Sequence, residues 1–296
     1  MKNNFDKDNI KIIKEKGITY PKGFQAAGIN CGIRPMRKDL ALIYSEQVAQ
    51  AASLFTQNQF KAAPLRITEE NLARSNGKIQ AILINSGIAN ACTGEKGLQD
   101  ARETVNYISE YLNIKPEHVA VASTGKIGEF LPLEKMKSGI KEAVNQLSIQ
   151  GGAEAAEAIL TTDTRKKEIA ISVNLNGKEF RIGGIAKGSG MIHPNMATML
   201  SFITTDLAIQ SNLLQEALRE VTAQTFNMIS VDGDTSTNDM VILMANGLAG
   251  NNIITEKKED YRLFLAALKL VTEYLAKEIA RDGEGATKLI ETEVQH

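Results

Sequence analysis

The stretch Ile185-Ala-Lys-Gly-Ser-Gly-Met-Ile-His-Pro-Asn-Met-Ala-Thr-Met-Leu200 separates two kinds of predicted structure. Two glycines and Pro194 prevent a helix or a regular strand from running through its first half. Directly afterwards, residues 199–205 form an apolar and β-branched run that predicts a buried strand. Thr198 stands at the junction. Its hydroxyl is either a nucleophile held behind a glycine loop or simply the first side chain of the strand.

The segment Lys187-Gly-Ser-Gly-Met-Ile-His-Pro-Asn-Met-Ala-Thr198 resembles the self-cleavage motif of the ornithine acetyltransferase family, the bifunctional glutamate N-acetyltransferases and amino-acid acetyltransferases of arginine biosynthesis. Its fixed glycines and proline make the match specific. The resemblance implies that the chain breaks between Ala197 and Thr198. Residues 1–197 would then be an alpha segment and residues 198–296 the beginning of a beta segment, with two alpha and two beta chains forming a heterotetramer.

An amino-terminal threonine would carry its own catalytic base. A threonine hydroxyl is a weak nucleophile near neutral pH and needs a base within hydrogen-bonding reach. The α-amino group released by cleavage has an unperturbed pKa near ~8. The chain has only His118, His193 and His296, with no apparent Ser/His/Asp set, and His193 is interpreted as structural. The amino group of Thr198 is therefore the expected base.

The segment Val119-Ala-Val-Ala-Ser-Thr-Gly-Lys-Ile-Gly-Glu-Phe-Leu-Pro132 predicts a strand followed by a turn rich in small residues. A hydroxyl beside a glycine N–H can supply the two fixed donors of an oxyanion hole. By the resemblance, Thr124 supplies the hydroxyl and Gly125 the backbone N–H. Without the resemblance, Ser-Thr-Gly after a strand is more typical of an ordinary turn.

The resemblance assigns substrate binding to four residues, of which Thr198 is one. Thr161 opens a run of hydroxyl side chains and is the second, with Thr162 as its alternative. Lys187 would pair with a substrate carboxylate, whereas a lone loop lysine is usually solvated. Glu284 lies between two glycines and would hold the amino group of ornithine, whereas the same turn could merely cap a helix.

The composition indicates a soluble cytoplasmic protein. Lys plus Arg number 34 and Asp plus Glu number 35, a balance that favours neither nucleic acid nor an anionic membrane as partner. There is no run of 18 apolar residues and no apolar signal core at the start. Cys31 and Cys92 form neither a disulfide framework nor a metal-binding pattern. We therefore expect no metal and no cofactor, with acetyl-CoA entering only as an alternative acetyl donor.

The predicted elements indicate an α+β fold. Strands are predicted at 40–44, 80–85, 119–123, 168–175, 179–185, 199–205, 240–246 and 289–294, and helices at 95–111, 133–147, 153–159, 212–224 and 261–282. Asn176-Gly177 is a strong hairpin signal. We see no βαβ repetition and no Rossmann fingerprint. The resemblance specifies a layered α/β/β/α sandwich of mixed sheets, the N-terminal-nucleophile-like arrangement of a self-cleaving acyltransferase.

The expected reaction moves an acetyl group from N2-acetylornithine to glutamate, giving ornithine and N-acetylglutamate in cyclic arginine biosynthesis. An acetyl ester on Thr198 would link two half-reactions and give ping-pong kinetics. Two alternatives stay open: an amidohydrolase or aminopeptidase with the same nucleophile, and an inactive scaffold subunit. The scaffold alternative draws on length, because the resemblance implies longer family chains with further substrate-binding residues beyond residue 296.

Overall fold

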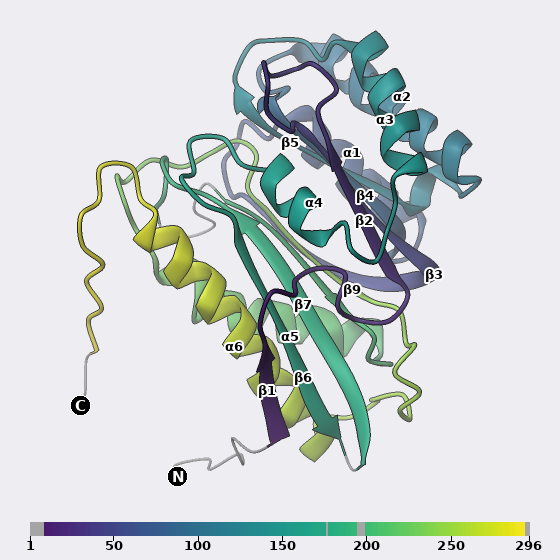
Figure 1. Cartoon of the computed structure of the whole chain (residues 1–296), viewed down its shortest axis with the longest axis vertical. Coiled ribbons are helices and arrows are strands. Elements are labelled where there is room, and N and C mark those ends of the chain that lie inside the picture. The colour runs from purple at the N-terminus through teal and green to yellow at the C-terminus, as the bar shows by residue number, and fades with distance from the viewer. Residues whose placement is uncertain (1–8, 176, 194–198, 294–296) are drawn as a thin grey trace.

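A computed structural model describes residues 9–175, 177–193 and 199–293. Within these ranges the chain forms one nine-stranded mixed sheet with helices on its outer faces (Figure 1). The strands are β1 (Ile10–Ile13), β2 (Phe24–Ile29), β3 (Leu40–Phe55), β4 (Lys78–Ile88), β5 (Val119–Lys126), β6 (Lys167–Leu175), β7 (Lys178–Lys187), β8 (Leu200–Thr205) and β9 (Met240–Ala245).

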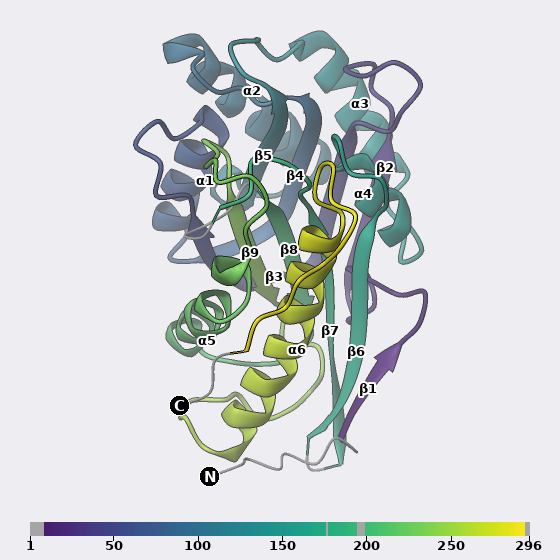
Figure 2. The same cartoon turned by 90° about the vertical axis from the view of Figure 1, so that its left-hand side faces the viewer.

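The helices are α1 (Ala63–Arg74), α2 (Gly94–Leu112), α3 (Leu133–Asn145), α4 (Gly152–Ala158), α5 (Ser211–Ala223) and α6 (Glu259–Arg281), with short 3-10 turns at Pro116–His118 and Phe226–Met228. Helices α5 and α6 lie on one side of the sheet, while α2 and α3 lie on the other (Figure 2). This separation of the helices confirms the predicted α/β/β/α layering.

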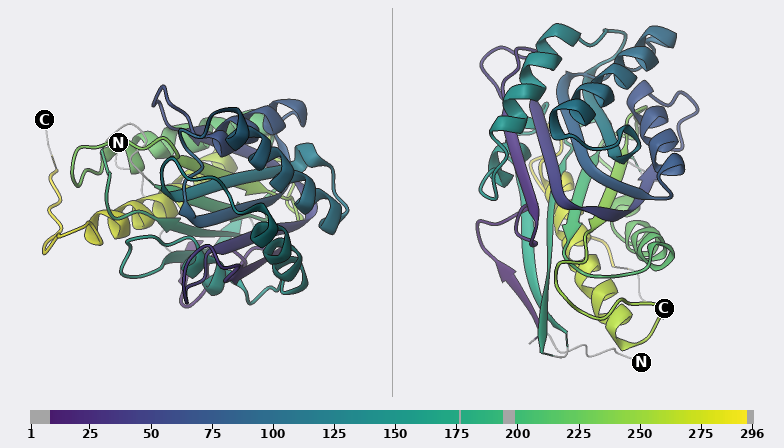
Figure 3. Two further views of the ribbon diagram at one scale, coloured as in Figure 1. Left: turned by 90° about the horizontal axis from the view of Figure 1, so that it is seen from above. Right: turned by 90° about the vertical axis from the view of Figure 1, so that its right-hand side faces the viewer.

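Strand β3 folds the single sheet into two layers. The strand order is β1-β6-β7-β8-β9-β3-β4-β5, with β2 also paired to β3. Residues 40–45 of β3 pair with β2, and residues 50–55 pair with β9. Strand β4 pairs with residues 40–44 and, after a break, with residues 49–50. Between these parts the register with β4 shifts and the side chains of residues 46–48 are exposed. β3 therefore leaves one layer and enters the other, and its curved ribbon can be followed in the right-hand view of Figure 3.

Three apolar cores hold the layers together. One lies between β6–β9 and helices α5 and α6, and another between β2–β5 and helices α2 and α3. The third lies between the two β layers and includes the alanines of α4. Strands β4 and β8 alternate between cores: Ile82 and Ile84 face the inner core while Ala81 and Leu83 face the outer one. Burial on both faces explains why these strands read as continuous apolar runs.

Two predictions about strands were wrong. Strands β4 and β5 are parallel and joined through α2, and β8 and β9 are parallel with α5 between them, so βαβ connections do occur. Residues 289–293, predicted as a strand, pair with no strand of the sheet. They lie instead beside α6, where Lys277 forms an ion pair with Glu291. The hairpin was predicted correctly: β6 and β7 pair through Leu175 and Lys178, and Gly177 has φ +83°.

Candidate active site

A hydrogen bond between the two β layers defines the centre of the site. Lys187 ends β7 in one layer, and its Nζ donates to Oγ1 of Thr124, which lies in β5 of the other layer, at 3.0 Å. Both side chains are buried, with 4% of Lys187 and 7% of Thr124 exposed. Folding of the sheet at β3 therefore brings together two stretches that lie far apart in strand order. These are the two stretches to which the sequence assigned chemistry.

The end of β5 is held rigidly. Gly125 has φ +131°, and a Cβ there would lie 2.2 Å from the carbonyl carbon of Gly87, so only glycine fits. The Ser123 hydroxyl donates to Oδ1 of Asn85 at 2.6 Å, and the Asn238 side-chain amide donates to the Ser123 carbonyl at 2.8 Å. Fixed geometry of this kind is what oxyanion donors require, because they must not reorient during the reaction.

Asp163 connects three parts of the site. Its Oδ1 accepts hydrogen bonds from the Gly188 N–H at 2.8 Å and from Lys167 Nζ at 2.6 Å, and its Oδ2 accepts from the Thr161 N–H at 3.1 Å. Burial raises the pKa of Asp163, but the charges of Lys187 and Lys167 outweigh that effect and hold it below its ordinary value. Asp163 is therefore a carboxylate that fixes the backbone on both sides of the centre.

Lys167 extends this network to the end of α6. Its ammonium contacts Oδ2 of Asp282 at 2.6 Å as well as Asp163, and its side chain is fully buried. Asp282 accepts a hydrogen bond from the Thr164 N–H at 3.0 Å, and its carbonyl accepts one from the Ser189 hydroxyl at 2.6 Å. The network thus joins the hydroxyl run at 161–164, the glycine loop and α6.

Glu284 belongs to the same cluster, although it is exposed. Its N–H donates to the Ser189 carbonyl at 2.9 Å. A Cβ on Gly190 would lie 2.6 Å from Cδ of Glu284, so the glycine allows the carboxylate to lie against the loop. Thr124, Gly125, Thr161, Lys187 and Glu284, all predicted as site residues, therefore lie in one connected cluster of hydrogen bonds and close contacts.

The predicted cleavage bond between Ala197 and Thr198 lies outside the described residues. On its carboxyl side, the Met199 N–H donates to Oδ1 of Asp239 at 3.1 Å. On its amino side, the Ile192 N–H donates to Oδ1 of Asp232 at 2.8 Å. Both flanks of the segment are thus held by carboxyl groups of the loop that precedes β9.

Asp239 has an unusual electrostatic environment. Burial raises the pKa of its carboxyl to about 8, against the lowering effects of the Met199 N–H and the charge of Lys187. The hydroxyls of Thr56 and Ser236 are close enough to lower the pKa as well. Even so, among the described residues no group meets its Oδ2 with full hydrogen-bond geometry. A carboxyl group whose pKa is raised to about 8 thus accepts a hydrogen bond from Met199, the residue that follows Thr198.

Sequence reasoning missed the ionic network behind the cluster. The sequence analysis assigned no role to Asp163, Lys167 or Asp282. One signal was present: Lys167 is in phase with Ile169 and Ile171 on the buried face of β6, where a lysine needs charged partners. His193, interpreted as structural, is exposed.

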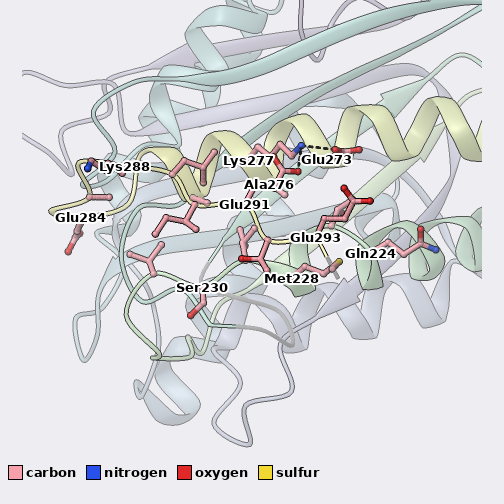
Figure 4. Close-up of a pocket in the computed structure, with 18 of the residues that line it drawn as sticks. Gln224, Met228, Ser230, Glu273, Ala276, Lys277, Glu284, Lys288, Glu291 and Glu293 are labelled. Carbon is pink, nitrogen blue, oxygen red and sulfur yellow. Dashed lines mark ion pairs between the residues drawn. The ribbon is translucent and has the colours of Figure 1, made fainter. Parts of the chain in front are cut away.

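Open space reaches the cluster from the side of Glu284. A cavity of about 430 Å³ is lined by Thr162, Ser189 and Glu284, among others. A larger groove of about 1000 Å³ lies between the end of α5, α6 and residues 284–293 (Figure 4). In that groove Lys277 forms ion pairs with Glu273 and Glu291, each at 2.8 Å. Glu284 lines both spaces, so a ligand can approach the cluster along it.

The cluster can stabilise a developing negative charge and hold a small charged substrate. Thr124 and Gly125 offer donors at a fixed strand end, Lys187 supplies a buried cation and Glu284 an exposed carboxylate. Within the described ranges, no group of three His, Cys, Asp or Glu side chains could hold a metal ion. Nor is any helix in the described part of the chain long and apolar enough to cross a membrane.

Sequence comparison identifies relatives over almost the whole chain. The ArgJ family model matches residues 25–296. "Arginine biosynthesis bifunctional protein ArgJ" of Staphylococcus aureus (strain Mu50) is 53% identical over 286 residues, which cover 97% of this chain and 69% of that protein. The protein of the same name from Bacillus subtilis (strain 168) is 53% identical over 286 residues, or 96% of this chain and 70% of that protein.

Solved structures give the same relatives and confirm the fold class. The ArgJ protein of Bacillus halodurans matches with a TM-score of 0.60 and 46% identity, covering 64% of this chain and 98% of that chain. Ornithine acetyltransferase of Mycobacterium tuberculosis, solved with ornithine, matches with a TM-score of 0.58 and 38% identity, covering 62% and 98%. An aminopeptidase of Ochrobactrum anthropi, described as a variant of the Ntn hydrolase fold, is 13% identical with a TM-score of 0.53, a likeness of fold alone.

Proposed function

This chain belongs to the ArgJ family, whose bifunctional members act in arginine biosynthesis, and we propose that it transfers an acetyl group from N2-acetylornithine to glutamate through an ester on Thr198. The observation that carries the proposal is the convergence of the predicted site residues. Thr124 and Lys187 share a hydrogen bond across the two layers, and Asp163 fixes the backbone of Thr161 and Gly188 beside them.

In the first half-reaction, Oγ1 of Thr198 attacks the acetyl carbonyl carbon, and the α-amino group of Thr198 takes the hydroxyl proton. The carbonyl oxygen becomes an oxyanion that Thr124 and Gly125 stabilise. The carbon–nitrogen bond then breaks, ornithine leaves with the proton, and the acetyl group stays on Thr198. Glu284, exposed beside the cavity, is placed to attract the positively charged amino group of ornithine.

In the second half-reaction, the amino group of glutamate attacks the acetyl ester, and the same oxyanion donors stabilise the second tetrahedral state. Loss of a proton from the amine and return of a proton to Oγ1 of Thr198 give N-acetylglutamate and the free enzyme. Because both half-reactions share one acetyl-enzyme, ornithine must leave before glutamate reacts. Ping-pong kinetics are the consequence.

The share of this chain that matches the solved relatives supports a break near the bond between Ala197 and Thr198. Residues 1–197 make up two thirds of this chain. The solved chains of the Bacillus and Mycobacterium proteins are matched over 98% of their own lengths, yet they cover only 64% and 62% of this chain. Coverage of this kind is expected when the relative consists of separate alpha and beta chains.

The test combines mass spectrometry with transfer assays. Under denaturing conditions we expect two pieces, the second beginning at Thr198, and Thr198→Ala should abolish both cleavage and transfer. Incubation with acetylornithine and glutamate should give N-acetylglutamate, whereas incubation without glutamate should give little free acetate. Retained transfer by Thr198→Ala would refute the nucleophile, and equal acetate release without glutamate would identify a hydrolase instead.

Three further expectations stay predictions. Acetyl-CoA as a second donor predicts release of the free CoA thiol when glutamate is the acceptor. A heterotetramer of two alpha and two beta chains predicts the corresponding mass in solution, measurable by light scattering. A cytoplasmic location predicts that the protein fractionates with cytoplasmic enzymes.

A further inference from the structure

We propose that Lys187 is a positioning residue for Thr124: its ammonium occupies a lone pair of the Thr124 hydroxyl and so directs the hydroxyl hydrogen toward the reacting carbonyl oxygen. The inference rests on the proposed function, because it takes from there the role of Thr124 in oxyanion stabilisation. It differs from the pairing with a substrate carboxylate that the sequence analysis expects of Lys187.

Hydrogen-bond accounting fixes the direction of the contact. A lysine ammonium has three donors and no acceptor, whereas a threonine hydroxyl has one donor and two acceptor lone pairs. At 3.0 Å, Lys187 Nζ must donate and Thr124 Oγ1 must accept. The hydroxyl hydrogen of Thr124 therefore points away from the ammonium. The neighbouring Ser123 differs, because its hydroxyl donates to Asn85 and has no hydrogen left for a ligand.

The ammonium is held in place by the surrounding structure. Lys187 is the last residue of β7 and pairs with Leu200 of β8, and the next N–H along the chain, that of Gly188, donates to Asp163 at 2.8 Å. Thr124 is equally fixed by its position in β5. A donor held between two strand ends reorients little as charge develops, which is the property that makes an oxyanion donor effective.

The pKa of Lys187 lies below its ordinary value, because burial outweighs the charges of the carboxyl groups around it. Burial lowers its pKa, while Asp163, Asp239 and Glu284 oppose that effect and Lys167 adds to it. A substrate carboxylate would add a further negative charge where the carboxylates of Asp163 and Glu284 already act on the same ammonium. The neutral hydroxyl of Thr124 brings no further charge to this site. A hydrogen bond from a charged donor polarises the O–H bond of that hydroxyl.

A substrate without a carboxylate or an amine can distinguish orientation of Thr124 from binding of a substrate carboxylate. p-Nitrophenyl acetate can transfer its acetyl group to Thr198, with the proton going to the α-amino group and p-nitrophenolate leaving as a coloured product. If Lys187 orients Thr124, Lys187→Met should slow this acetylation by about 100-fold, the effect of losing one oxyanion donor. Lys178→Met, at the opposite and exposed end of the same strand, is the matched control and should leave the rate unchanged.

A double-mutant cycle separates action through Thr124 from independent action. In a Thr124→Ala background, Lys187→Met should cost little more, and with acetylornithine the loss should appear in kcat rather than in KM. A normal p-nitrophenyl acetate rate with a raised KM for acetylornithine would overturn the inference in favour of carboxylate binding. Lys187→Gln keeps an N–H donor and covers the case in which the methionine variant does not fold. Failure of the unmutated protein to accept any acetyl group would refute the proposed function instead.

Discussion

Replacement of Lys167 by methionine tests whether the buried ionic network holds the site together. Methionine nearly preserves the side-chain volume but removes the ammonium that contacts Asp163 and Asp282 at 2.6 Å each. Two buried carboxylates then lose their common partner. Removal of one partner from a buried ion pair typically costs about 3–5 kcal/mol of unfolding free energy. We expect a loss of that size for Lys167→Met at pH 7.

The loss should depend on pH in a defined direction. Although burial raises the pKa values of Asp163 and Asp282, the charge and hydrogen bonds of Lys167 contribute to holding them below their ordinary values. Depressed folded-state pKa values contribute stability above the unfolded values near ~3.9, and this stability is lost as pH falls through the folded values. In the variant both carboxyls can take up protons more easily. The difference from the unmutated protein should therefore shrink from pH 7 toward pH 4.

Urea unfolding at several pH values is the assay. With an m-value of about 2–3 kcal/mol/M, the expected loss moves the midpoint by roughly 1–2 M. Lys166→Met is the matched control, because Lys166 is 45% exposed and pairs with Glu168 at the surface. Exposed pairs contribute about 0–1 kcal/mol. Equal midpoints for the two variants at pH 7 would refute the assignment of Lys167 as the centre of a buried network.

Three other predictions concern single residues near the site. Asp239→Asn should become increasingly stable relative to the unmutated protein between pH 4 and pH 8. A carboxyl group with its pKa raised to about 8 loses its contribution to the free energy of unfolding as pH rises through that value. Urea midpoints of both proteins at pH 5, 7 and 9 would check this, and a constant difference between them would contradict it. Gly125→Ala should cost several times the roughly 1 kcal/mol expected for Gly128→Ala, because only the former places a Cβ against neighbouring backbone; similar melting temperatures would argue against the close approach. Gly190→Ala should displace the carboxylate of Glu284 and therefore raise the KM for acetylornithine more than it lowers kcat. An unchanged KM would exclude Glu284 from substrate binding.

Most elements could be predicted because their signals are local. The alternation in β6 and β7 and the glycine of their turn lie within twenty-one residues, and α6 shows a continuous helical period. Of strand β3, only residues 40–44 were predicted as a strand, since the polar middle of β3 looks like a loop. In the structure those residues are exposed where the strand crosses between layers. No local pattern distinguishes a loop from a long strand that changes its partners.

The candidate site residues could be named from the sequence, but the contacts between them could not. The motifs point to Thr124, Lys187 and Glu284, yet nothing in them places the ammonium of Lys187 on the hydroxyl of Thr124. That contact depends on the folding of the sheet at β3, which brings β5 and β7 together although four strands separate them in the sheet order. The signal from Lys167 was weaker, because a lysine on a buried face indicates a partner without identifying it.

The position of β8 and β9 determines what self-cleavage can release. Both strands follow Thr198 in the chain, and both lie in the interior of the sheet, with β8 paired to β7 and β9 paired to β3. Scission at residue 197 would therefore create a new terminus without freeing a fragment. Departure of the later piece would remove one neighbouring strand from β7 and one from β3, and would open two apolar cores. The nick is expected to be invisible to gel filtration and to native electrophoresis, and the two halves should part only when the whole sheet unravels.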